Sequence, residues 1–101
     1  MLIIPIQPVP SQTLTVVLSS QQTQIDIRQQ STGLYVDLYV NNTLIIGGVI
    51  AQNANRIVRD AYLGFVGDIA FLDTQGREDP IFDGLGSRYV LAYFAPAELP
   101  A

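Results

Sequence analysis

Hydrophobic and polar positions alternate along residues 33–50, and this stretch organises the prediction for the whole chain. One face of the first half is apolar and the other carries Tyr35, Asp37 and Tyr39; the apolar positions are Leu34, Val36, Leu38 and Val40. A period of two is typical of a strand with one buried face. Asn41-Asn42 follows, and asparagine tolerates the positive φ of a type I′ turn, so a tight hairpin is predicted. The pair Gly47-Gly48 indicates a bulge in the second strand, which continues through Val49–Ala51.

A second hairpin is predicted upstream of the first. Residues 12–18 and 23–28 both alternate, and the polar run 19–22 separates them as a turn. Ile25 and Ile27 face inwards in this prediction, whereas Asp26 and Arg28 face outwards. The two hairpins together give a predicted core made of Leu14, Val16, Leu18, Ile25, Ile27, Leu34, Val36, Leu38 and Val40.

The rest of the chain is read as shorter strands and extended segments. Residues 68–72 and 88–94 look like strands, the second with Tyr89, Leu91 and Tyr93 on one face, and residues 73–84 form a loop rich in turn residues. Residues 56–65 fit either a helical turn or a bent strand. Closely spaced prolines predict an extended arm or edge strand over 1–11 and an extended tail over 95–101. The expectation is one all-β domain over 1–101, a small antiparallel β-barrel or β-sandwich of about seven strands.

Composition narrows the class of protein. The chain has 101 residues and a net charge of −4, which disfavours nucleic-acid binding because phosphates require a basic surface. No apolar run approaches the roughly 20 residues of a membrane-spanning helix, and no signal peptide is recognised, so synthesis in a cytoplasm is expected. Charged residues make up only 14% of the chain, and lysine is absent. A free monomer normally carries more surface charge, so either a Thr- and Gln-rich surface or a surface covered by other chains is indicated.

Candidate chemistry is sparse. Histidine and cysteine are both absent, which excludes the usual triads and transition-metal ligand sets, so no catalytic residue, metal or cofactor is predicted. A carboxylate pair could hydrolyse glycosides, but no local signature marks one among Asp37, Asp68, Asp73, Asp79 and Asp83. The acidic loop 73–83 lacks the EF-hand spacing and is better explained as turns. Tyr35 and Tyr39 could stack on a sugar, although packing or burial in a protein interface is commoner.

Two segments are the best candidates for contact with other proteins. The arm has apolar side chains but cannot pair as a central strand, and a solitary monomer is expected to leave those side chains poorly covered. Residues 56–65 concentrate arginine and aromatic residues, which are enriched at interface hot spots, although an ordinary core strand explains the segment nearly as well. The predicted interface residues are Leu2, Ile3, Ile4, Ile6, Arg56, Arg59, Tyr62 and Phe65.

Four stretches of sequence resemble a phage family: 3–14, 31–41 (Ser-Thr-Gly-Leu-Tyr-Val-Asp-Leu-Tyr-Val-Asn), 55–68 and 83–89. They are similar to the small baseplate plug proteins of contractile-tailed phages, first described for a cyanophage. The resemblance implies a non-enzymatic structural component of the virion, in the tail baseplate near the hub and tube. It also implies hub, tube and wedge proteins as partners and a copy number that is a multiple of three. A carbohydrate-binding, receptor-binding or hydrolytic β-domain stays open as the alternative.

Overall fold

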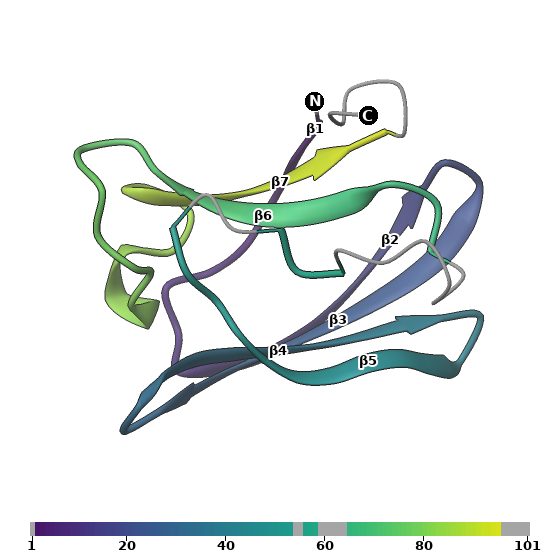
Figure 1. Ribbon diagram of the computed structural model, residues 1–101, viewed down its shortest axis with the longest axis horizontal. Coiled ribbons are helices and arrows are strands. Elements are labelled where there is room, and N and C mark those ends of the chain that lie inside the picture. Colours follow the sequence, from purple (N-terminus) through teal and green to yellow (C-terminus); the bar gives the residue numbers. More distant parts are fainter. Residues whose placement is uncertain (1, 54–55, 59–64, 96–101) are drawn as a thin grey trace.

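Two antiparallel sheets face one another in the computed structural model of the chain, which describes residues 2–53, 56–58 and 65–95 (Figure 1). One sheet has three strands in the order β1-β7-β6, and the other has four in the order β2-β3-β4-β5. The strands are β1 (Leu2–Ile4), β2 (Ser11–Leu18), β3 (Gln21–Gln30), β4 (Gly33–Val40), β5 (Thr43–Ile50), β6 (Asp68–Asp73) and β7 (Tyr89–Phe94). The predicted all-β class is confirmed, and of the two architectures considered the sandwich fits.

The four-stranded sheet is a meander, because two-residue turns connect its neighbouring strands. Asn41 and Asn42 both have positive φ, at 50° and 67°, as the type I′ turn requires. Ser19 and Ser20 adopt the same region, with φ of 50° and 64°. The predicted turn over 19–22 is therefore too long: the chain reverses within two residues, and Gln21 already belongs to β3.

A bulge occurs where the glycine pair predicted one. The β4–β5 register shifts between Val36 and Leu38 and again between Leu38 and Tyr39, so β5 carries extra residues opposite β4. Gly48 has a φ of 65°, and its backbone N–H donates to Asp37 Oδ1 at 2.7 Å. A residue with a side chain would be strained in this conformation, which explains why glycine stands here.

The core lies between the sheets and receives side chains from both. Six of the nine predicted core residues are fully buried, and the other three, Leu14, Val16 and Val40, are partly buried and pack against them. The three-stranded sheet contributes Ile69, Phe71, Leu91 and both Tyr89 and Tyr93. The prediction that Tyr89, Leu91 and Tyr93 share one face of the last strand is confirmed, and the structure shows that this face points into the core.

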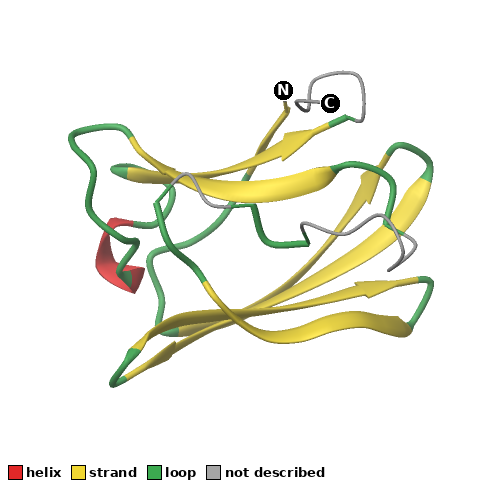
Figure 2. Cartoon of the chain, viewed as in Figure 1, coloured by secondary structure: helices red, strands yellow, loops and turns green. Residues whose placement is uncertain are grey.

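The segments outside the sheets are mostly loops. A single 3₁₀ turn, Phe82–Gly84, is the helical element of the described residues, drawn in red in Figure 2. Within the described part of the chain, no helix is long and apolar enough to cross a membrane.

Candidate protein interface

The N-terminal arm is an edge strand of the chain's own fold. β1 pairs antiparallel with β7, with Leu2 opposite Tyr93 and Ile4 opposite Leu91. Ile4 is 1% exposed and Ile6 7%, so both contribute to the core. The expectation that these two side chains would be poorly covered in a single chain is wrong. Pairing with β7 turns Ile4 inwards, and Ile6, beyond the end of β1, also belongs to the core. Leu2 and Ile3 remain 49% and 46% exposed and are the arm's available contact residues.

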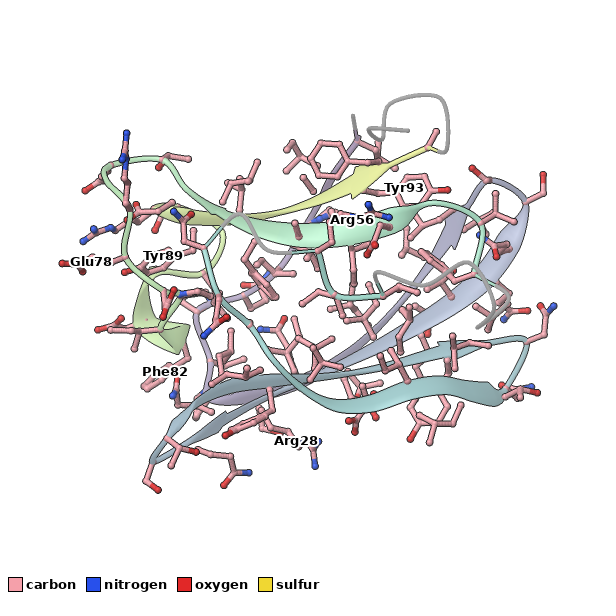
Figure 3. The ribbon with its side chains drawn as sticks, viewed as in Figure 1. Arg28, Arg56, Glu78, Phe82, Tyr89 and Tyr93 are labelled. Carbon is pink, nitrogen blue, oxygen red and sulfur yellow. The ribbon has the colours of Figure 1, made fainter. Side chains whose placement is uncertain are left out.

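The segment that begins at Arg56 is partly built into the fold. Arg56 Nε donates to Asp68 Oδ2 at 3.0 Å, and the buried Asp68 also accepts the backbone N–H of Val58 at 2.8 Å (Figure 3). Phe65 is 4% exposed and meets Tyr93 edge to face, with ring centroids 5.9 Å apart. The alternative reading, in which the apolar side chain enters the core, therefore applies to Phe65. Arg59 and Tyr62, the other predicted interface residues of this segment, lie outside the described residues.

Arginine–aspartate pairs account for three of the candidate carboxylates. Asp37 binds Arg28 at 2.9 Å on the outer face of the four-stranded sheet. Asp68 binds Arg56, and Asp73 binds Arg88 through two hydrogen bonds of 2.9 Å each. These pairs come from separate strands and loops, so the structure does not bring the candidate carboxylates together into one site. Arginine here joins strands and loops of the chain itself, which the sequence interpretation did not foresee.

Asp73 organises the acidic loop that follows β6. Besides Arg88, it accepts the backbone N–H groups of Gln75 and Glu78, both at 2.9 Å. Asp79 accepts the N–H of Asn53 at 3.0 Å. With these oxygens engaged, the loop is explained by internal hydrogen bonds. No group of three or more acidic side chains suited to a metal ion occurs within the described residues.

The Arg88 guanidinium, through its hydrogen bonds, holds the pKa of Asp73 well below the ordinary carboxyl range. A depressed folded-state pKa means that this pair stabilises the fold above the unfolded carboxyl pKa of about 4. The contribution is lost as the pH falls from there towards the folded-state value. Asp73→Asn is therefore expected to lower the melting temperature at neutral pH and to flatten its dependence on pH between about 4 and 2.

Thermal melts of both proteins across this pH range test the assignment. Glu78→Gln is the matched control. Glu78 also pairs with Arg88, but at a longer 3.4 Å and with its side chain 70% exposed, so this pair contributes little to stability. The melting temperatures of Glu78→Gln should therefore follow those of the unsubstituted protein. If the melting temperatures of the unsubstituted protein and of Asp73→Asn fall in parallel as the pH is lowered, the Asp73–Arg88 pair does not stabilise the fold.

Tyr35, Asp37 and Tyr39 share the outer face of β4, as the alternation predicted, and all three are partly buried. The Tyr35 hydroxyl is hydrogen-bonded to the Thr32 hydroxyl at 2.7 Å. Asp37 lies opposite Asp26 on β3, and its Oδ1 is engaged by both Arg28 and the Gly48 N–H. This face offers tyrosine rings beside hydrogen-bonded polar groups, a surface that suits another protein or a sugar.

Single exposed apolar residues stand next to each of the two hairpin turns. Val17, 66% exposed, precedes the Ser19-Ser20 turn, and Leu44, 54% exposed, follows the Asn41-Asn42 turn. Hydrogen bonds tie these turns and a third segment together: Asn41 N–H donates to Gln22 O, and Gln21 binds the backbone of Val66 through both N–H and C=O. Val66 is itself 45% exposed. We call Val17, Leu44 and Val66 the hairpin-end residues; the sequence signal for Val17 was a valine among threonines on a polar strand face.

These features define a small β-sandwich in which Asp37, Asp68, Asp73 and Asp79 bind the chain's own arginines or backbone, and whose surface carries several exposed apolar residues. A family model described as "Cyanophage baseplate Pam3 plug gp18" matches residues 1–96, and the chain belongs to this family. The resemblance stated from the sequence is thereby confirmed. No curated protein matches the chain. Family membership makes the chain a phage baseplate plug protein, a structural component of the virion's tail baseplate.

Proposed function

We propose that this protein fills a gap near the hub and tube of the baseplate and acts only through contacts with neighbouring proteins. The family match over residues 1–96 carries the proposal. The low charge of the chain supports it, since 14% charged residues is little for a surface exposed to solvent on all sides. The partners are hub, tube and wedge proteins, the copy number is a multiple of three, and the protein is made in the host cytoplasm.

The contact surface of this proposal is narrower than the set predicted from the sequence. Leu2 and Ile3 are retained because they are half exposed on an edge strand. Arg59 and Tyr62 are retained as predictions. Ile4, Ile6 and Phe65 are better explained by the core, and Arg56 by its bond to Asp68. The hairpin-end residues are added as three further exposed apolar candidates.

Substitution of the exposed arm residue tests the contact surface. Ile3→Ser is expected to weaken co-purification with the hub and tube proteins by at least tenfold while the melting temperature changes little, because Ile3 is not part of the core. Ile81→Ser is the control: Ile81 is 47% exposed, similar to Ile3 at 46%, but lies in the loop before the 3₁₀ turn. Equal co-purification of both variants with the partners would remove the arm from the interface.

The alternative is a receptor-binding or carbohydrate-binding role for the outer face of β4, which carries Tyr35 and Tyr39. In that alternative, Tyr39→Ala abolishes binding to an array of host-surface glycans, whereas Ile3→Ser leaves it unchanged. Our proposal expects no glycan binding by the unsubstituted protein and no release of sugar from any glycan. Binding that depends on Tyr39 would favour the alternative over the structural role.

A further inference from the structure

The two sheets have four edges, and three of them are protected against pairing with another strand. β1 has only three residues and is followed at once by Pro5. The outer edge of β6 is bridged by Asn53 and Arg56, and β5 is distorted by its two register shifts. Short strands, bulges, proline and covering segments are the usual means by which sheet edges avoid unwanted pairing.

The fourth edge, β2, is preceded at once by Pro10, but within its own eight residues it shows none of these features in the described part of the chain. Its eight residues pair with β3 in an unbroken register from Ser11 opposite Arg28 to Leu18 opposite Gln21. The strand contains no proline and no charged residue. Natural edge strands of this length usually carry a lysine, a proline or a bulge, so an unprotected edge of eight residues indicates that another strand covers it.

The direction of the backbone groups on β2 follows from the hydrogen bond that Gln29 N–H donates to Pro10 O at 2.7 Å. Residues of an antiparallel strand alternate between bonding one neighbour and the other. The even-numbered residues of β2 therefore bond β3. The odd-numbered ones direct their N–H and C=O groups to the free edge, and they are Ser11, Thr13, Thr15 and Val17.

The side chains of β2 suit an uncharged apolar neighbour. Leu14 and Val16 point towards the core but are only partly buried, in contrast to their fully buried partners on β3, Ile25 and Thr23. On the other face, Thr13 and Thr15 are exposed. A covering strand that places apolar side chains beside Leu14 and hydroxyl side chains beside the threonines would extend both faces of the sheet.

We propose that β2 pairs antiparallel with β2 of a second copy of this chain, about a two-fold axis. One register uses every outward backbone group of both strands: Ser11 opposite Val17 and Thr13 opposite Thr15, with Leu14 of each copy meeting on the axis. In this arrangement the two four-stranded sheets become one continuous sheet, and the half-covered Leu14 side chains cover one another. A two-fold, self-complementary contact is the commonest form of protein dimer.

The absence of charge favours a second copy as the occupant. A charged edge strand paired with itself would set like charges close together, which is destabilising. β2 brings no charged residue to the axis, and no charged residue precedes Asp26 in the chain. The pairs that result include Thr13 with Thr15, a combination that stabilises sheets, and Leu14 with Leu14, whose apolar side chains would cover one another. The inference does not depend on the proposed place in the baseplate, and three such dimers would agree with a copy number divisible by three.

Single cysteines test the pairing, because the chain has none of its own. In the proposed register the two Leu14 residues form a non-hydrogen-bonded pair with Cα atoms about 4.5 Å apart, within disulfide range. Leu14→Cys is therefore expected to give a covalent dimer of twice the 11.0 kDa chain mass on mild oxidation. Val16→Cys is the matched control on the same face: its two copies would be about 13 Å apart and should stay unlinked.

Sedimentation of the purified chain without any introduced cysteine gives a second measurement of dimer formation. Thr15→Pro is the variant expected to block the dimer. The Thr15 N–H faces the free edge, so proline there removes a donor that the monomer does not use, and the fold should persist while the dimer is lost. Val16→Pro removes a donor that faces β3 and should instead lower the melting temperature. A chain that sediments as a monomer at millimolar concentration, or that crosslinks equally through both cysteines, overturns the proposal and leaves the edge to a different protein.

Discussion

Leu38→Ala is expected to lower the free energy of unfolding by about 2–5 kcal/mol, the range for a leucine removed from a packed core. Leu38 is 0% exposed and lies on β4, a central strand of the four-stranded sheet. Its removal leaves a cavity between the two sheets that strands held by neighbours on both sides cannot easily close. Urea denaturation followed by circular dichroism measures the loss.

Leu44→Ala is the matched control for this substitution. Leu44 is also a leucine and lies on the adjacent strand, but it is 54% exposed. Its replacement should change the free energy of unfolding by no more than about 0.5 kcal/mol. Equal losses at both positions would mean that the face of β4 assigned to the core is wrong.

Gly67→Ala is the second substitution with a large expected effect. Gly67 has a φ of 95°, and an added Cβ would clash with the backbone oxygen of Phe94 and lie 2.6 Å from the Tyr93 hydroxyl. That hydroxyl is hydrogen-bonded to Val66 O and to Ser19 Oγ, so it links the two sheets. We expect a loss of about 1–2 kcal/mol from the left-handed backbone and about 1–3 kcal/mol more from the forced contacts.

The control for Gly67 is Gly76→Ala. Gly76 does not have a positive φ, and a Cβ there would come no closer than 3.4 Å to its neighbours in an exposed loop. The melting temperature of Gly76→Ala should stay close to that of the unsubstituted protein. If Gly67→Ala melts as Gly76→Ala does, the close contact between the chain at Gly67 and the end of β7 is not formed as described.

The alternation of residues predicted the four-stranded sheet well because each of its strands has one buried face. The signal in Leu34, Val36 and Leu38 is physical: a shift of one residue would expose all three. The Asn41-Asn42 turn and the bulge at Gly47-Gly48 were predictable because asparagine and glycine tolerate positive φ, which few other residues do. The turn at Ser19-Ser20, which lacks such residues, was predicted two residues too long. What the sequence did not show was the acceptor for the bulged N–H, Asp37, because that contact depends on the register between β4 and β5.

The candidate interface was harder to predict, and the reason lies in pairing between distant segments. Ile4 and Ile6 looked poorly covered because nothing near them in the sequence could bury them. Ile4 lies opposite Leu91 of the last strand, and Ile6 joins the core that the two sheets form together. Arg56 and Phe65 likewise have partners, Asp68 and Tyr93, that only the assembled three-stranded sheet brings close. An arginine or aromatic residue in a short segment therefore marks a contact without showing whether the contact is internal.

This chain belongs to a structural family of the tail baseplate, and we propose that it touches the hub and tube proteins there. Chemical crosslinking of purified phage particles, followed by mass spectrometry, tests it most directly. We expect the chain in every intact particle, in a copy number divisible by three, with crosslinks to hub or tube proteins. Its absence from purified particles, or its presence there without crosslinks to any baseplate protein, would contradict the account.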